Sequence, residues 1–515
     1  MKFFDAAFEK LRVSIRSQKT FRDSMCIRSP LRSNGSHLVI AYLSQAHTSP
    51  ELQIVESRFR CVYNDEMSET EEGRIVGYTE LLKTNRDFRN LWIGRVISQT
   101  GDWFNSVALF TLLLNLTGSG EAIGLVLIIK LLPQFLVGPL AGVVADRFNR
   151  KAIMIWADVL RGVLVFGFLF VNRPEQVWIV YLLAGLEIIL SSFFEPAESA
   201  AVPMIVRREE LIAANALGGA TWSLTLAFGA ALGGAVTDLF GRNTAFVIDA
   251  ISFFISAAFI WATRIPKLPK RERDSAQRMS WLEMTGMADM IEGVRYLKTN
   301  PHVIALLLVK SGWGLGGGVL LLLAIFGREI FPLGHDGSAS IGLLYAARGT
   351  GALLGPMIAT WITDDSPRPM RRTISIAFFV SAIFYLLFSG SPSLVLALLF
   401  VIGAHAGGSI QWVFSTTLLQ LAVPNRFLGR VFALEMGFLT LAMSLSTYVT
   451  GWGLDHAGLS ARQMAAWLGA AFLIPGLTWL VLQRWLDKFE TGLGERTPTA
   501  IEAEPATETS FPPVA

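Results

Sequence analysis

Charged residues are scarce in this chain, and cysteine and histidine are scarcer still. Only 17% of the 515 residues are charged and 52% are hydrophobic, whereas soluble globular proteins carry about 25% charged residues. The two cysteines, Cys26 and Cys61, both lie in the polar N-terminal region, which excludes a disulfide framework. The six histidines form no pair at the spacing of metal ligands. We therefore expect a membrane protein with no metal site, no cofactor and no enzyme activity.

Long apolar runs occupy most of the chain from residue 88 onward. A helix needs about 20 mostly apolar residues to cross a bilayer, and it satisfies its own backbone hydrogen bonds within the hydrocarbon. The sequence contains twelve such candidate spans. They cover residues 90–115, 121–145, 151–171, 176–197, 212–238, 242–263, 302–327, 338–363, 372–389, 393–416, 428–453 and 463–484. The expected fold is an all-α integral membrane protein with twelve transmembrane helices.

Basic residues gather in alternate loops. The loops after even-numbered spans contain a basic segment over 264–298 and Arg147, Arg150, Lys151, Arg207, Arg208, Arg368, Arg371, Arg372, Arg426 and Arg430. In the loops after odd-numbered spans, scattered basic residues are offset by acids. Because basic loops stay in the cytoplasm, we predict a multi-pass protein of the plasma membrane with both termini cytoplasmic. The net charge of +3 is too small to indicate nucleic-acid binding.

The longest connection divides the twelve spans six and six. It separates a predicted N-terminal six-helix bundle, residues 88–263, from a C-terminal one, residues 302–485, through a linker over 264–301. Apolar residues recur at every third or fourth position of the linker, which predicts an amphipathic helix. They are Trp281, Met284, Met287, Ile291, Val294 and Leu297. This helix either lies in the inner leaflet or, as we favour, packs under the two bundles.

The two bundles repeat each other in sequence. "IGLVLIIKLLPQFLVGPLAG" from Ile123 and "IGLLYAARGTGALLGPMIA" from Ile341 share their Ile-Gly-Leu start at an offset of 218, which sets Lys130 against Arg348. Their Gly-Pro pairs correspond at an offset of 217. Two parallel six-helix repeats are a transporter architecture, in which the substrate site lies near the midplane between the repeats.

Both ends of the chain fall outside the predicted bundles. Residues 1–87 form a polar N-terminal extension, in which Met67 begins "MSETEEGRIVGYTELL", an ordinary short cytoplasmic start. We therefore expect residues 1–66 to be a mis-assigned translation start, or else a targeting or regulatory extension. Residues 486–515 are rich in Pro, Thr and Glu, which predicts a disordered tail.

Several ionisable residues lie within the predicted spans, where each charge costs roughly 2.5 to 3.5 kcal/mol on insertion scales. Arg95, Gln99 and Asp102 lie on one face of the first span, so we predict that they line a cavity. A second set of basic residues predicts that the cavity is positively charged and suits an anionic or polar substrate. Embedded acids could instead neutralise these basic residues. The basic residues are Lys130, Lys310 and Arg348, and the neutralising acids are Asp102, Glu187, Asp249 and Glu435.

The source of energy is also predicted from embedded residues. Asp102 and Glu187 are the expected proton-coupling acids, because burial favours the protonated form of a carboxyl group. Asp158 and Arg161 are i, i+3 neighbours in the third span and are expected to form a local pair. The stretch "GWGLGGG", 312–318, lacks the Gly-Lys-Ser/Thr ending of a phosphate-binding loop and predicts helix flexibility or close packing. An ion gradient is therefore the expected energy source.

The turn after the second span carries a motif of glycines and charges. It consists of Gly138, Gly142, Asp146, Arg147, Arg150 and Lys151. In this loop of this topology, the motif resembles the loop 2–3 signature of the major facilitator superfamily. "RNLWIGRVISQTGDWF" resembles the start of the branch that contains enterobactin exporters and macrolide efflux proteins. The resemblance covers residues 88–485 and implies the major facilitator fold.

Two other stretches depart from the family pattern. In the fifth span, "GAALGG" with Gly229, Gly233 and Gly234 resembles the antiporter motif GPxxGG, but Ala230 stands in place of its proline. In the fourth span many members carry a buried arginine, whereas this chain has Glu187. The proton relay of the family therefore cannot be transferred residue by residue.

The loop 2–3 motif predicts a contact that changes with conformation. Gly138 and Gly142 lie on one helical face and would let a neighbouring helix approach closely. Asp146 can accept hydrogen bonds from the N-terminus of a helix, where the macrodipole is positive. The resemblance implies that this helix is the eleventh span, near residues 428–430. Such a latch exists only while the cytoplasmic side is closed, and the basic residues of the motif also fix the topology.

These features predict a secondary active transporter that works by alternating access as a functional monomer. Its expected partners are the lipid bilayer, protons and a small organic substrate, siderophore or drug-like, which it exports. The alternatives are an importer or uniporter of the same fold, a protein that flips lysophospholipid, and a membrane scaffold that transports nothing.

Overall fold

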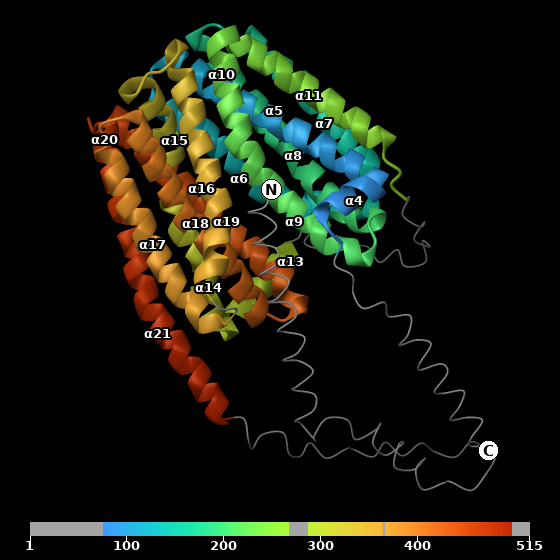
Figure 1. The fold of residues 1–515 in the computed structure, drawn as a ribbon, viewed down its shortest axis with the longest axis vertical. Helices are drawn as coiled ribbons and strands as arrows, with labels where there is room; N and C mark the ends of the chain where they lie inside the picture. The colour runs from blue at the N-terminus through green and yellow to red at the C-terminus, as the bar shows by residue number, and fades with distance from the viewer. Residues whose placement is uncertain (1–75, 267–286, 364–365, 497–515) are drawn as a thin grey trace, which may run out of the picture. The chain divides into compact units, whose positions relative to one another are not determined.

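The computed structural model of the chain describes residues 76–266, 287–363 and 366–496, and the regular elements in these ranges are all helices (Figure 1). The chain divides into two units, residues 1–76 and 77–515, and the described helices belong to the second. Three predictions fall outside the described residues. They concern the translation start at Met67, the linker positions Trp281 and Met284, and the last part of the tail.

The all-helical membrane fold is confirmed. Within the described ranges, 11 helical segments are long and apolar enough to cross a membrane, and they match the second to the twelfth predicted spans. The first predicted span is helix α5 (Arg86–Thr117), whose 32 residues extend for about 48 Å at 1.5 Å per residue. It has the length to cross a bilayer, but Asp87, Arg95 and Asp102 reduce its apolar character.

The N-terminal bundle consists of six membrane-crossing segments. They are α5, α6 (Gly120–Arg147), α7 (Arg150–Phe166), α8 (Val177–Ile205), α9 (Leu211–Leu224) continued by α10 (Ala230–Phe240), and α11 (Arg242–Ala262). A π-helical turn, η4 (Thr225–Gly229), joins α9 to α10. Side chains of Asn85, Ser119 and Asn149 accept backbone hydrogen bonds in the first turns of α5, α6 and α7, which explains where these helices begin.

A short helix, α4 (Tyr78–Thr84), precedes the predicted bundle boundary at residue 88. The Asn85 amide that follows it donates to the Ile205 carbonyl at 2.8 Å and to Glu210 at 3.2 Å. Burial alone would raise the pKa of Glu210, but hydrogen bonds from Arg207 and Asn85 outweigh burial and lower the pKa below its usual value. Because the folded pKa is the lower one, this stabilisation is present near neutral pH and is lost as the pH falls through it.

The C-terminal bundle repeats the arrangement. Its segments are α14 (Pro301–Gly314) with α15 (Val319–Ile325), α16 (Ser338–Ile362), α17 (Pro367–Ser389), α18 (Leu394–Ala422), α19 (Asn425–Asp455), and α20 (Ala461–Ala471) with α21 (Leu473–Arg496). The prediction that disorder starts at residue 486 was wrong, because α21 continues to Arg496. Asp487 binds the buried Arg371 at 2.7 Å, which ties this extension to α17.

The glycine-rich stretch at 312–318 interrupts the seventh span between α14 and α15. A Cβ atom at Gly317 would lie 2.7 Å from the Met443 backbone, and one at Gly318 would collide with Thr450. The freed Gly318 N–H donates to Ser446 Oγ at 3.1 Å. The glycines therefore allow α19 to pack against the break, which confirms the prediction of close packing.

The described part of the linker forms helix α13 (Met287–Thr299), which packs on α19 (Figure 1). Gly293 and Leu297 are buried in this contact, and Tyr296 stacks on Phe427 with ring centroids 4.4 Å apart. The predicted helix is confirmed for these residues, and its contacts with α19 and α14 place it on the C-terminal bundle rather than under both bundles as predicted. Ile291 and Val294 were predicted to lie on the packed apolar face, but both are exposed. The small residue Gly293 packs against α19 in their place.

The two bundles meet chiefly along two helix pairs, α6 with α19 and α10 with α16, and α16 also contacts η4, α9 and α5. We name the two ends of the bundles by the residues that lie there. The basic end carries the loop 2–3 motif and the first turns of α17 and α19. The opposite end carries the starts of α6 and α16 and the ends of α10 and α19.

Candidate functional site

The opposite end is closed by a contact between the bundles. The carboxylate of Asp455, at the last turn of α19, accepts hydrogen bonds from the backbone N–H groups of Gly120 at 3.0 Å and Glu121 at 2.9 Å, and one from the Ser119 hydroxyl. It thereby caps the N-terminus of α6, where the macrodipole favours a negative charge. We call this contact the opposite-end latch.

A second contact at the same end repeats this chemistry on the other helix pair. The carboxylate of Asp238, at the end of α10, accepts a hydrogen bond from the backbone N–H of His335 just before α16. Nearby, Asn115 donates to Asp336 at 2.6 Å. A Cβ at Gly234 would lie 2.8 Å from Gly342 Cα, so the two helices touch by their backbones.

The antiporter-like glycines therefore have a packing role. A Cβ at Gly229 would lie 3.2 Å from Trp103, and one at Gly233 would lie 2.9 Å from Phe104 Cα. These two glycines let α10 and η4 approach α5, while Gly234 faces α16. Ala230, which replaces the proline of the family motif, is fully buried.

The glycines of the loop 2–3 motif at the basic end have open space around them. Among the described residues, no neighbouring helix comes within 4 Å of the place where a Cβ would stand at Gly138, Gly142 or Gly429, so these residues do not show the expected close approach. The Asp146 side chain lies outside the described residues.

The basic residues of the motif bind within their own bundle. Arg150 donates to the Ala145 carbonyl at 3.1 Å and the Ala200 carbonyl at 2.9 Å, and Lys151 donates to the carbonyls of Trp261 and Thr263. Arg147, which follows Asp146, is exposed. The motif thus joins α6 and α7 to the ends of α8 and α11.

Arg161 of α7 is the centre of a charge cluster inside the N-terminal bundle. Its guanidinium lies 2.7 Å from Asp102 of α5, 3.6 Å from Glu187 of α8 and 3.9 Å from Asp158 of its own helix. It also stacks over the Phe253 ring at 4.1 Å. The predicted pair with Asp158 exists, but it is the longest of three ion pairs. We call Arg161 and its acids the Arg161 cluster.

A fourth acid, Asp249 of α11, completes the cluster. Carboxylate oxygens of Asp102, Glu187 and Asp249 all lie within 4.8 Å of one another. Asp249 is fully buried and its Oδ2 has no hydrogen-bond partner. A Cβ at Gly101 would lie 2.5 Å from the Asp249 carboxylate, so that glycine leaves the room the acid needs.

Solvent reaches the Arg161 cluster from one side. The Asp102 side chain is 33% exposed, whereas Glu187 is 6% and Asp158 is 0% exposed. A further cation, Lys130, approaches Ser106, one turn after Asp102, at 3.4 Å. Even with Lys130 counted, the acids outnumber the bases by two. Four ionised carboxylates in so dry a site would repel one another, so the cluster has the composition to hold protons.

The predicted stripe of Arg95, Gln99 and Asp102 does not act as one surface. Arg95 lies 3.8 Å from Glu195 and 3.4 Å from Glu198, near the basic end of α8, and it stacks over Phe194. Asp102 instead faces Arg161, and Gln99 is half-buried between them. The ion pairs of Arg95 lie within the N-terminal bundle.

The C-terminal bundle holds a separate buried ion pair. Lys310 of α14 lies 2.8 Å from Glu435 of α19, and both side chains are almost fully buried. The Lys310 ammonium also lies 4.5 Å from the centre of the Trp412 ring. The expectation that Glu435 neutralises an embedded cation is confirmed for Lys310. Lys310 therefore adds no unpaired positive charge to a cavity in this structure, and its role toward a substrate stays a prediction.

A hydrogen bond between Tyr385 and His405 was missed by sequence reasoning. Tyr385 Oη lies 2.8 Å from His405 Nε2, and Trp313 packs edge-on against the imidazole. The two residues are 20 apart in sequence, on α17 and α18, so spacing gave no signal. Both are buried beside α16, where Gly351 allows His405 to approach.

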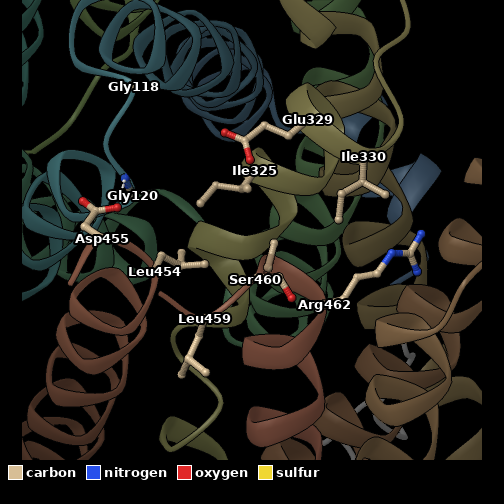
Figure 2. A pocket seen from close by; sticks show the side chains of 11 residues that line it. Gly118, Gly120, Ile325, Glu329, Ile330, Leu454, Asp455, Leu459, Ser460 and Arg462 are labelled. Carbon is tan, nitrogen blue, oxygen red and sulfur yellow. Dashed lines mark hydrogen bonds between the residues drawn. The ribbon is translucent and has the colours of Figure 1, made fainter. Parts of the chain in front are cut away.

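A pocket of about 460 Å³ opens at the opposite end (Figure 2). Its charged lining residues are Glu329, Asp455 and Arg462, and Leu454 and Ile325 form part of its apolar wall. In the close-up, Asp455 and Glu329 stand on different sides of the space. The pocket adjoins the opposite-end latch and contains none of the predicted site residues.

Known proteins with similar sequences are membrane transporters, in agreement with the helical fold described above. Residues 91–447 match the family model described as Major Facilitator Superfamily. The chain is 25% identical over 72% of its length to macrolide efflux protein A of Streptococcus pyogenes, covering 90% of that protein. It is 26% identical over 77% of its length to the uncharacterized MFS-type transporter YfiS of Bacillus subtilis, covering 91% of it.

A solved structure shares the fold at low sequence identity. It is a bacterial homolog of the human lysosomal transporter Spinster, in an inward-facing and unoccupied conformation. The TM-score is 0.60 and the identity 16%, with 78% of this chain and 98% of that chain covered. Together with the 11 membrane-crossing segments found among the described residues, the match over residues 91–447 shows that the chain belongs to the Major Facilitator Superfamily of transporters.

Proposed function

We propose that the chain is a proton-coupled exporter of a small organic molecule that works by alternating access. The Arg161 cluster carries this proposal, because four carboxyl groups and one guanidinium share a dry site that Asp102 connects to solvent. Relatives named as a macrolide efflux protein and a putative bacilysin exporter favour the outward direction. With the basic end in the cytoplasm of the cell, the protein is a plasma-membrane monomer with both termini inside.

In this proposal, Asp102 exchanges the proton. When Asp102 is ionised it neutralises Arg161, and when it is protonated Arg161 turns to Glu187, which already lies 3.6 Å away. Asn105 donates to Glu187 at 3.2 Å and holds that acid in place. Since Asp102, Arg161 and Glu187 lie on three different helices, α5, α7 and α8, a change of partner alters how these helices pack, which couples protonation to conformation.

Replacement of Asp102 by Asn tests the coupling. We expect Asp102→Asn to abolish the dependence of efflux on the proton gradient, because the amide can neither bind nor release a proton. Efflux of erythromycin and of carboxyfluorescein is measured from pump-deficient cells, with and without a protonophore. Gln99→Ala, one turn away and uncharged, is the control and should keep the protonophore effect. Unchanged protonophore sensitivity in Asp102→Asn would exclude this acid as the proton carrier, and retention of both compounds by cells with the wild type would refute export of these probes.

The contacts at the two ends suggest how access alternates. Asp455 ends α19 and caps α6 in the structure, and Asp146 ends α6 and, we propose, caps α19 in the other state. Because α6 and α19 are antiparallel, each helix would offer an aspartate to the N-terminus of the other. The open glycines of the loop 2–3 motif agree with a state in which the opposite end alone is latched.

Opposite shifts are expected from Asp455→Asn and Asp146→Asn. The first weakens the opposite-end latch and should favour opening of that end, and the second should favour the state seen here. A helix-terminal charge contributes about 0.3–1 kcal/mol, so each shift should change the ratio of states by about two- to fivefold. Distances between spin labels at each end, measured in the purified protein, report the populations. Shifts in the same direction for both variants would contradict the reciprocal arrangement, and Asp238→Asn should behave like Asp455→Asn.

A further inference from the structure

Arg348 is a buried cation at the contact between the bundles. Its side chain lies on α16, it is 8% exposed, and its Nε has no hydrogen-bond partner. Among the described residues it forms no ion pair, unlike the other buried arginines, Arg161 and Arg371. An unpaired buried charge is strongly unfavourable, so a side chain kept in this state is expected to meet its counter-charge from outside the chain.

The groups around Arg348 are aromatic and neutral. Trp222 of α9, in the other bundle, lies under the guanidinium with its ring centre 5.7 Å away and is 42% exposed. Tyr345, one turn before Arg348, uses its hydroxyl to donate to the Leu320 carbonyl at 2.7 Å. The aromatic wall therefore supplies no negative charge to Arg348.

A second unpaired donor lies on the same side of α16. The ring of Trp103 packs against Tyr345 with centroids 6.3 Å apart, and the indole N–H of Trp103 is buried without a partner. Arg348 Nε and Trp103 Nε1 are both donors and neither can accept. A ligand that satisfies them must bring acceptor atoms, and a negatively charged oxygen group satisfies the guanidinium best.

We propose that the transported molecule is an organic anion whose acidic group binds Arg348 and whose flat apolar part lies on Trp222. This inference rests on the proposed transport function and adds the class of substrate. The pseudo-equivalent cation Lys130 lies 3.4 Å from Ser106, on the side of the Arg161 cluster, so Arg348 is the cation of the proposed anion site. Trp103 directly follows Asp102 in α5, so this one helix carries a residue of the Arg161 cluster and a residue that packs against α16 beside Arg348.

Equilibrium binding to the purified full chain tests the proposal without a proton gradient. The probes are 1-naphthylacetate, its neutral amide 1-naphthylacetamide and the cation 1-naphthylmethylammonium, titrated by calorimetry. We expect the wild type to bind the carboxylate about tenfold more tightly than the amide, and Arg348→Gln to lose this preference. Arg348→Lys should keep a reduced preference, and Trp222→Leu should weaken the three probes alike. Arg173→Gln, an exposed arginine at the opposite end, is the matched control.

Stability measurements separate a binding role from a structural one. Because Arg348 has no internal counter-charge, Arg348→Gln should unfold at the same temperature as the wild type or higher. No carboxylate binding, equal affinity for the three probes, or an unchanged preference in Arg348→Gln would each overturn the proposal. Proton-driven export of erythromycin without carboxylate binding would refute the anion inference and leave the proposed exporter intact. Carboxylate binding without proton-dependent efflux would support the anion inference and refute the proposed proton-coupled exporter.

Discussion

Arg161→Gln is expected to abolish proton-dependent transport and to destabilise the protein. The variant leaves Asp102, Glu187, Asp158 and Asp249 in a dry site without their guanidinium, and removal of one partner of a buried ion pair typically costs about 3–5 kcal/mol. The acids can then escape repulsion only by holding protons, so they can no longer release them during transport. Protonophore-sensitive efflux and thermal unfolding of the purified protein are the two measurements.

Two further variants separate lost coupling from lost folding. Arg161→Gln combined with Asp102→Asn removes one negative charge as well, so it should recover part of the stability but none of the proton dependence. Arg173→Gln removes an exposed arginine from a loop and should change neither measurement. If Arg161→Gln keeps both its unfolding temperature and its protonophore sensitivity, the Arg161 cluster is not the coupling site.

The sequence predicted the helices well because each one is a local property. Hydropathy and loop charge depend on neighbouring residues, and eleven of the twelve predicted spans are recovered as apolar helices. The packing role of the glycines at 312–318 was likewise visible from residue type, whereas the seventh span was predicted as one continuous helix and its break between α14 and α15 was not. The end of α21 was not, because Asp487 is held by Arg371, which lies 116 residues earlier.

The candidate site was predicted only in part, because its contacts are distant in sequence. Asp102 and Glu187 stood out as embedded acids, but Arg161 had only Asp158 within reach along its own helix. The structure brings α5, α7, α8 and α11 together and makes Arg161 the partner of acids from other helices. Asp455 and Asp238 were read as loop acids that offset basic residues, since nothing in the sequence says which helix N-terminus a terminal carboxylate will face.

Loss of one member of the Lys310–Glu435 pair is the second large effect that we expect. Lys310→Met leaves the fully buried Glu435 without its cation, and Glu435→Gln leaves Lys310 charged among Trp412 and Phe432. Each single change should lower the free energy of unfolding by about 3–5 kcal/mol. The double variant Lys310→Met with Glu435→Gln should lie close to the wild type, because it leaves no unpaired charge. Chemical unfolding of the purified protein, followed by tryptophan fluorescence, gives the four values.

The double-variant cycle also decides what the pair does for transport. Lys310 and Glu435 join α14 to α19, and α19 carries both the opposite-end latch and the contact with α13. If the pair only holds these helices together, the double variant should restore efflux along with stability. If stability returns and efflux does not, the charges themselves take part in the transport cycle. Four equal unfolding energies would mean that the pair is not formed in the membrane protein, and α14 and α19 would then be held together by apolar packing alone.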